Sequence, residues 1–203
     1  DGVSDETAAA MMLKGLTAWF LLRRCYRVRA GESVLLHSAS GGVGLIALQW
    51  AVSLAAHVIA VVSSDEKAEV ARKYGAADVI VSDREDLVER VRTITKRRGV
   101  SVVYDGVGKD TFFASLDCLM PRGMMVSYGN ASGPVPPISP LELTKRGSLY
   151  LTRPTLFHYI AKPSSLARGA SSLFEMVASG KVKLRIGQTY PLADAAQAHR
   201  DLE

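Results

Sequence analysis

A run of glycines between an apolar segment and a helical segment is the strongest chemical signal in the sequence. It reads Ser38-Ala39-Ser40-Gly41-Gly42-Val43-Gly44. Glycine lets the backbone approach a phosphate closely because no Cβ stands in the way, and the free amides of a helix N-terminus favour an anion. A tight turn also recruits glycine for purely structural reasons. The run follows the first predicted strand and opens a helix, however, and this context favours a site for a dinucleotide pyrophosphate.

The residues after the second apolar segment indicate which dinucleotide is preferred. A carboxylate at this position suits the ribose diol of NAD, whereas hydroxyl groups and a cation suit the 2′-phosphate of NADPH. Ser63 and Lys67 fit the second pattern, while Asp65 could fit the first. Asp65 could equally stabilise the N-terminus of a helix, and Ser63 with Glu66 matches a capping box. We therefore expect NADPH as the cofactor.

Two further glycine turns follow predicted strands. Val107 lies in the turn at residues 105–108, and Tyr128 and Gly129 lie in the turn at residues 127–130. Ligands of doubly wound folds bind at the carboxyl ends of the strands, so both turns could line the nicotinamide end of a cofactor. Ordinary loop chemistry explains these glycines equally well, and the sequence leaves the two interpretations open.

Alternating strands and helices must position these residues. Because helices of this length act as crossover connections, the strands form a parallel sheet covered on both faces. We expect an α/β fold, a Rossmann-type doubly wound six-stranded parallel sheet with helices on both faces. The predicted strands cover residues 33–37, 57–62, 78–81, 100–104, 123–128 and 149–151. The predicted helices cover residues 6–26, 45–55, 65–74, 85–97, 110–119, 140–145 and 164–179, with an extended piece at 183–190 and a last helix from 193.

Composition excludes several classes of function. The chain has 203 residues, 48% of them hydrophobic, and a net charge of +5. Its basic residues are dispersed and lack the interleaved aromatic residues of a nucleic-acid platform, so we expect no nucleic-acid partner. The longest apolar stretch, residues 43–60, is interrupted by polar residues, which argues against a membrane span. The N-terminus does not resemble a signal peptide. Two widely separated cysteines, Cys25 and Cys118, predict reduced thiols and a cytoplasmic location.

No metal ligand set and no catalytic side chain emerge from the spacing of residues. The four histidines are scattered without a zinc-binding pattern, so we expect no metal site. A short-chain dehydrogenase needs a tyrosine and a lysine four residues apart, whereas Tyr159 and Lys162 are three apart. A methyltransferase with a similar sheet stays open as an alternative at this point. The catalytic residues remain unknown.

Several ordered motifs resemble one family along essentially the whole chain. They are Lys14–Ala18, Ala39–Gly44, Tyr104–Gly108, Ser127–Asn130, Leu151–Pro154 and Tyr190–Ala195. Together they are similar to the zinc-independent NADPH:quinone oxidoreductases of the medium-chain dehydrogenase/reductase superfamily. The resemblance implies hydride transfer from NADPH to a quinone or another small electrophilic substrate. An enoyl or alkenal reductase of the same superfamily and a non-enzymatic NADPH-binding module are the alternatives.

The resemblance also implies roles for particular residues. The pyrophosphate would be held by Gly41, Gly42 and Val43, and the adenosine phosphate by Ser63 and Lys67. The nicotinamide end would be surrounded by Thr17, Val107, Tyr128, Gly129 and Arg153. This chain has Ser82 where many relatives carry a tyrosine near the 2′-phosphate, so that contact would be shorter or lost.

The family resemblance finally implies a domain organisation. We expect one nucleotide-binding domain over residues 1–203, with leading helices at 1–30, the Rossmann core at 31–152, and last helices at 153–203. The last part would partially return to a substrate-binding domain that this sequence lacks, so the chain alone would bind cofactor but catalyse poorly. Relatives pair through the sixth strand, so we expect a homodimer.

Overall fold

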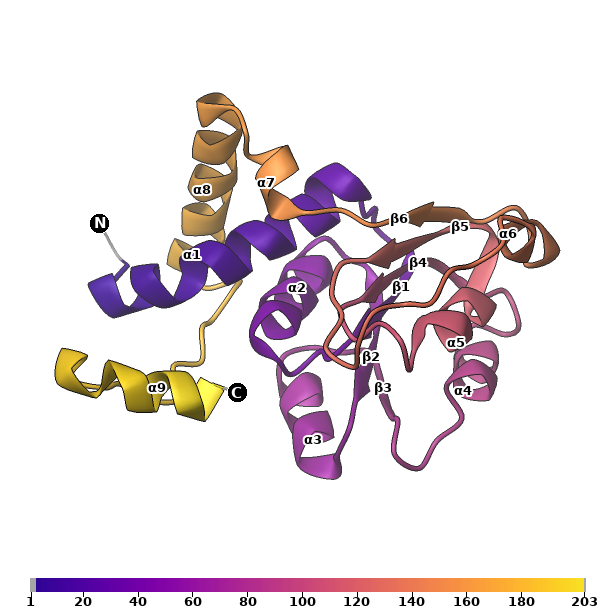
Figure 1. The fold of residues 1–203 in the computed structure, drawn as a ribbon, viewed down its shortest axis with the longest axis horizontal. Helices are drawn as coiled ribbons and strands as arrows, with labels where there is room; N and C mark the ends of the chain where they lie inside the picture. Colours follow the sequence, from indigo (N-terminus) through magenta and orange to yellow (C-terminus); the bar gives the residue numbers. More distant parts are fainter. Residues whose placement is uncertain (1–2, 203) are drawn as a thin grey trace.

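An open, entirely parallel sheet forms the centre of the computed structural model, which describes residues 3–202 (Figure 1). Its six strands lie in the order β3-β2-β1-β4-β5-β6. Because the strand order reverses between β1 and β4, the sheet is doubly wound, which confirms the predicted fold. The strands are β1 (Ser33–His37), β2 (His57–Val62), β3 (Asp78–Val81), β4 (Val100–Asp105), β5 (Leu119–Ser127) and β6 (Tyr150–Thr152).

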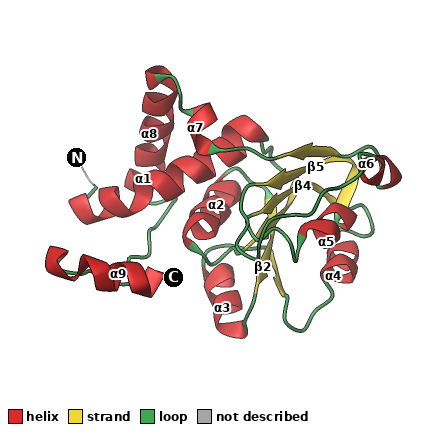
Figure 2. Ribbon diagram, viewed as in Figure 1, coloured by secondary structure: helices red, strands yellow, loops and turns green. Residues whose placement is uncertain are grey.

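Helices connect the strands and cover both faces of the sheet (Figure 2). A π-helical turn at Leu21–Cys25 extends the first helix, and a 3₁₀ turn at Leu192–Asp194 precedes the last. The helices are α1 (Asp5–Phe20), α2 (Gly42–Ser53), α3 (Asp65–Lys73), α4 (Leu87–Ile94), α5 (Phe112–Asp117), α6 (Leu141–Lys145), α7 (Leu156–Tyr159), α8 (Pro163–Ala178) and α9 (Ala195–Leu202).

Alternate residues of each central strand point into two separate hydrophobic cores. In β1, Val34 and Leu36 join the core that also contains residues of α1, α2 and α3, whereas Leu35 joins the core beneath α4 and α5. In β2, Val58 and Ile59 divide between the two cores in the same way. Strands buried on both faces have nearly continuous apolar sequences, which is why the first three predicted strands match the observed ones.

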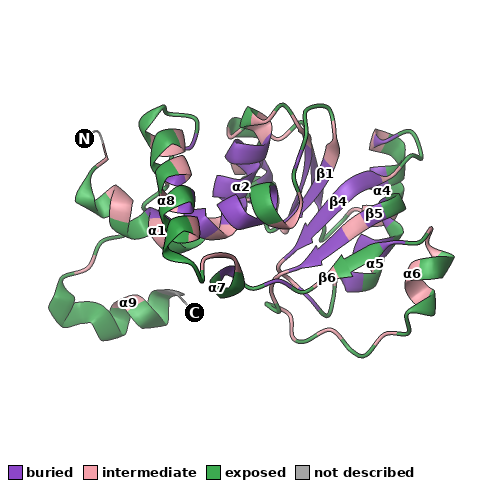
Figure 3. Ribbon diagram, turned by 90° about the horizontal axis from the view of Figure 1, so that it is seen from above, coloured by how far each residue is buried: buried purple, intermediate pink, exposed green. Residues whose placement is uncertain are grey.

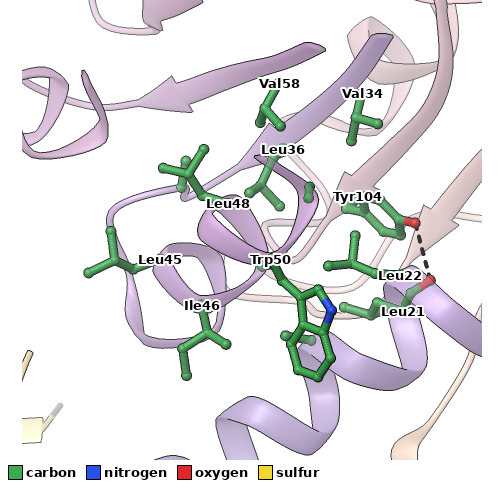
Figure 4. Packing of buried hydrophobic residues seen from close by; sticks show 14 of the residues in the cluster. Leu21, Leu22, Val34, Leu36, Leu45, Ile46, Leu48, Trp50, Val58 and Tyr104 are labelled. Carbon is green, nitrogen blue, oxygen red and sulfur yellow. Dashed lines mark hydrogen bonds between the residues drawn. The ribbon is translucent and has the colours of Figure 1, made fainter. Parts of the chain in front are cut away.

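The first helix is tied to the sheet by a buried hydrogen bond. The hydroxyl group of Tyr104 on β4 donates to the carbonyl oxygen of Leu21, at a distance of 3.1 Å, beside Leu22 and Trp50 in the larger core (Figure 4). On its other side α1 packs closely against α8, because a Cβ on Gly15 would lie 2.5 Å from both Leu173 methyl carbons. These contacts give α1 a fixed position beside the sheet.

Several predicted boundaries were wrong. α2 begins at Gly42, three residues before the predicted start, because the glycine run itself forms its first turn. α4 is shorter than predicted at both ends. β5 begins at Leu119, where a helix was predicted to continue, and its register with β4 shifts between Val100 and Val102. α7 was not predicted at all, since four residues carry too little periodicity to be recognised.

The segment after Val182 is far less buried than the sheet. The predicted extended piece at 183–190 forms no strand in the described part of the chain, and Leu192 is 92% exposed. The first seven residues of α9 lie almost entirely at the surface (Figure 3). Over residues 3–202, none of the helices combines the length and apolar character that a membrane crossing demands.

Candidate dinucleotide site

The glycine loop between β1 and α2 leaves no room for side chains at its tightest point. A Cβ on Gly44 would lie 2.1 Å from the carbonyl oxygen of Ser38, so only glycine fits there. The turn is closed by the amide of Gly41, which donates to the same Ser38 oxygen at 2.9 Å. Gly41 is also the N-cap of α2 and offers no side-chain oxygen to it. The first amides of this twelve-residue helix are therefore available to an anion without competition from a capping side chain.

A cavity of about 1030 Å³ lies at the carboxyl ends of the strands, beside this loop. Five of the predicted site residues line it, and they come from the segments that follow β1, β2, β3 and β4. Residues far apart in the sequence thus meet at one edge of the sheet, at the point where the strand order reverses. The five are Gly41, Ser63, Lys67, Ser82 and Val107.

Ser63 and Lys67 form one polar group on the wall of this cavity. The ammonium group of Lys67 donates to Ser63 Oγ at 2.7 Å, although the two residues lie on different elements. The predicted capping box was wrong, because the N-cap of α3 is Ser64, whose side chain accepts from the Lys67 amide at 3.4 Å. Ser63 therefore does not cap α3, and it lines the cavity.

Asp65 does not reach the cavity. Its carboxylate forms an ion pair with Arg84, and Asp65 is absent from the residues that line the cavity. It also occupies the first turn of α3, where a negative charge is favourable. The carboxylate that could have served a ribose diol is thus directed toward Arg84.

Ser82 directly follows β3 and lines the same cavity. Its hydroxyl group donates to the carbonyl oxygen of Val62 at 3.2 Å and to Asp83 at 3.3 Å. The first of these contacts holds the short side chain against the backbone of β2.

Asp105, which sequence analysis did not single out, organises the opposite wall. Its fully buried carboxylate accepts hydrogen bonds from the amides of Val107 and Gly108 at 2.8 and 3.0 Å. It also accepts from the hydroxyl groups of Thr111 and Ser115 at 2.7 and 3.0 Å. Four donors thus hold the Val107 loop in one conformation. An aspartate at the end of an otherwise apolar strand was the signal that could have revealed it.

His37 connects β1 to this network. Its Nε2 lies 2.9 Å from Ser115 Oγ, and the side chain is 1% exposed at the edge of the cavity. Because Ser115 donates to Asp105, the serine oxygen accepts from His37, which places the histidine proton on Nε2. Burial lowers the pKa of His37 below its usual value of 6.5, and the nearby Asp105 carboxylate only partly opposes this shift.

A second cavity of about 450 Å³ contains three further predicted residues, Thr17, Tyr128 and Arg153. Thr17 comes from α1, Tyr128 from the loop after β5, and Arg153 from the segment after β6. Burial, and then the charge of Asp105, raise the pKa of Tyr128 to about 12. Its phenol is therefore neutral and able to donate a hydrogen bond at physiological pH.

Gly42, Val43 and Gly129 line neither cavity. Gly42 and Val43 form the first turn of α2, and Val43 packs partly against the larger core. Gly129 allows two loops to touch, because a Cβ there would lie 2.4 Å from the carbonyl oxygen of Gly106. Among residues 3–202 no group of three or more histidine, cysteine or acidic residues could hold a metal ion.

Comparison with known proteins identifies the family of the chain. The family model described as "zinc-binding dehydrogenase" matches residues 42–165. The chain therefore belongs to the zinc-binding dehydrogenase family, within the medium-chain dehydrogenase/reductase superfamily. It is 49% identical to a quinone oxidoreductase of Pseudomonas aeruginosa over 202 residues, covering 100% of this chain and 62% of that protein.

Relatives of known structure share the fold closely. The quinone oxidoreductase of Escherichia coli complexed with NADPH is 49% identical, with a TM-score of 0.94 over 98% of this chain and 62% of that one. A 2-haloacrylate reductase structure is 47% identical, with a TM-score of 0.95 over 98% of this chain and 62% of that one. The chain thus spans about 62% of the length of these relatives.

Proposed function

We propose that this chain is the NADPH-binding part of a quinone reductase. The observation that carries the proposal is the 1030 Å³ cavity at the carboxyl ends of the strands, with the glycine loop on one side and Ser63 with Lys67 on another. Several of the relatives that match are quinone oxidoreductases, and the Escherichia coli structure contains NADPH. In this assignment, the larger cavity binds the adenosine end of the cofactor and the smaller cavity the nicotinamide end.

Preference for NADPH over NADH is supported by the charges around the larger cavity. A 2′-phosphate needs a cation and hydroxyl groups, which Lys67 and Ser63 supply. The competing carboxylate of Asp65 is paired with Arg84. Ser82 would add at most a hydroxyl contact, since its side chain is short and bonded to the β2 backbone.

The glycine loop fits a pyrophosphate. The backbone of Gly41, Gly42 and Val43 would provide amide donors at the N-terminus of α2, where the helix dipole favours negative charge. The loop held by Asp105 presents Val107 to the same cleft. A Cβ at Gly44 would push the loop apart, so glycine at this position keeps the turn tight and the loop in the shape proposed for the pyrophosphate.

NADPH, when bound, supplies the hydride. The quinone takes up that hydride and one proton, and the products are NADP⁺ and a hydroquinone. The chain's own contribution is orientation. Thr17, Tyr128 and Arg153 surround the smaller cavity, and the neutral phenol of Tyr128 can donate a hydrogen bond to the ribose or the carboxamide. We assign no catalytic acid to this chain.

The remaining organisation is part of the same proposal. Residues 1–30 would be leading helices, 31–152 the Rossmann core, and 153–203 the return toward a substrate domain outside this chain. A homodimer is supported by the edge strand β6, where Tyr150 is 59% and Leu151 37% exposed. Sedimentation at several concentrations would test the homodimer, and a monomer at every concentration would contradict it.

Free Cys25 and Cys118 support a reducing, cytoplasmic location.

A second candidate substrate is an activated alkene. The 2-haloacrylate reductase of Burkholderia is 47% identical over 98% of this chain, and its name indicates a conjugated substrate. The nucleotide site would be the same for both reactions. Assays of the full-length protein with quinones, 2-haloacrylates and enones would separate the two functions.

Calorimetric titration of the 203-residue chain with NADPH and with NADH is the direct test. We expect one site per chain and tighter binding of NADPH by at least about tenfold, the value of one charge-assisted contact. Absence of binding would overturn the proposal, and equal affinities would overturn the assignment of Ser63 and Lys67. Binding of a methyl donor in place of either nucleotide would favour a methyltransferase.

A further inference from the structure

Lys14, a residue of α1, lies directly over the glycine loop. A Cβ on Gly42 would stand 2.8 Å from Lys14 Cδ and Cε and 3.0 Å from its Nζ. The lysine side chain therefore occupies the space that any side chain at position 42 would enter. Lys14 is 28 positions away in the sequence, and only the packing of α1 against α2 brings the two together.

The ammonium group of Lys14 has no carboxylate partner. In the part of the chain that the structure describes, none of the ion pairs within 4.0 Å includes Lys14. Asp201 lines another cavity together with Lys14, but its carboxylate accepts hydrogen bonds from Tyr190 and Gln197. Among residues 3–202, no carboxylate thus pairs with this positive charge next to the N-terminus of α2.

The position of Lys14 matches the middle of a dinucleotide. Thr17 lies three residues further on the same helix, hence on the same face, and lines the smaller cavity. Gly41, adjacent to Gly42, lines the larger cavity. A molecule with one nucleoside in each cavity would carry its diphosphate past the glycine loop that Lys14 contacts, although Lys14 itself lines neither of the two cavities. The diphosphate bridge carries two negative charges. Backbone amides are neutral donors, whereas an ammonium group adds a full positive charge to the hydrogen bond.

We propose that Lys14 is a second phosphate-binding lysine, which pairs with the diphosphate bridge of the cofactor. This inference rests on the proposed function of the site. It divides the electrostatic work between two lysines: Lys67 recognises the 2′-phosphate and selects NADPH, while Lys14 binds the diphosphate that NADPH and NADH share. Lys14 therefore contributes affinity without selectivity.

Three ligands separate these roles. NADPH carries both phosphate groups, ADP carries a diphosphate without a 2′-phosphate, and adenosine 2′-monophosphate carries only the 2′-phosphate. Binding is measured by calorimetry on the 203-residue chain and on Lys14→Met, which keeps the apolar stem. We expect Lys14→Met to weaken NADPH and ADP by the same factor, about tenfold, and to leave adenosine 2′-monophosphate unchanged. Lys14→Arg should restore most of the loss.

Two controls keep the outcomes distinct. Lys73→Met removes an exposed lysine from the C-terminal end of α3 and should leave the affinity for all three ligands unchanged. Thermal unfolding shows whether Lys14→Met is folded. Unchanged NADPH affinity in Lys14→Met overturns the inference, and so does an equal loss for all three ligands or a loss that Lys14→Arg does not restore. If the unaltered chain binds no NADPH, the proposed function itself has failed.

Discussion

The two ends of the nucleotide cleft are built differently. The larger cavity is formed by segments that follow four neighbouring strands, and its walls are held by the buried carboxylate of Asp105 and by the Lys67–Ser63 contact. The smaller cavity draws on α1, the loop after β5 and the segment after β6. Among residues 3–202, Arg153 is the one charged residue that lines it; Arg153 is exposed and donates weakly, at 3.5 Å, to the carbonyl oxygen of its neighbour Pro154.

This difference suggests that the larger cavity provides the affinity for the cofactor, while the smaller cavity orients its reactive end. The end assigned to adenosine is lined by residues from four segments and braced by the buried Asp105 network, so it should provide most of the binding free energy. The end assigned to nicotinamide is open, and the matched relatives are longer than this chain, which spans 62% of them. The contrast predicts that substitutions on the larger cavity weaken binding strongly and those on the smaller cavity weakly.

The largest effect is expected for Gly44→Val. Its Cβ would lie 2.1 Å from the Ser38 carbonyl oxygen, which is backbone and cannot rotate away. We expect NADPH affinity to fall by more than about 100-fold and the free energy of unfolding to fall by about 3 kcal/mol or more. Calorimetry and urea unfolding measure the two quantities. Gly187→Ala, where nothing lies within 4 Å of the added Cβ, is the control. Normal binding by Gly44→Val would mean that the loop is not part of the site.

Lys67→Ala should have the next largest effect. Removing the ammonium group that contacts Ser63 should weaken NADPH by roughly 10- to 100-fold, the range of a contact to a charged phosphate. NADH, which has no 2′-phosphate, should bind as before. Paired titrations of both nucleotides measure the ratio. Lys73→Ala serves as a matched control at the far end of α3. An unchanged preference would show that the larger cavity does not select the cofactor by this lysine.

His37 should make the larger cavity sensitive to acid. Burial lowers its pKa in the folded protein below 6.5, so the unfolded chain takes up the proton first. The free energy of unfolding is therefore greatest above about pH 6.5. As the pH drops below that value, it decreases by up to about 1.4 kcal/mol per pH unit. Urea unfolding at pH 7.5, 6.0 and 5.0 should show a smaller slope in His37→Gln. Exposed His158, changed to Gln, should leave the slope as it was.

The smallest effect is expected for Arg153→Ala. An exposed charge in an open cavity contributes at most about 1 kcal/mol, so NADPH affinity should change by less than about fivefold. Calorimetry under the same conditions as for Lys67→Ala compares the two ends directly. Arg168→Ala, another exposed arginine outside both cavities, provides the baseline. A loss as large as that of Lys67→Ala would remove the proposed contrast between the ends.

The sequence by itself determined the sheet and the position of its glycine loop. The bounds of β1, β2 and β3 were predicted to the residue, because strands buried on both faces are short apolar runs that end abruptly in polar residues. Gly41, Ser63 and Lys67 could be found in the same way, since each follows a strand whose carboxyl end lies at the ligand edge.

Only the tertiary structure decided which charges face the cleft. Asp65 and Lys67 are neighbours on one helix, yet Arg84 holds the first and Ser63 contacts the second. Lys14 reaches the glycine loop only because α1 packs on α2. Periodicity reports which face of an element is buried, but the partner of a charged side chain depends on atoms from other elements. That information arises only when the elements are packed together.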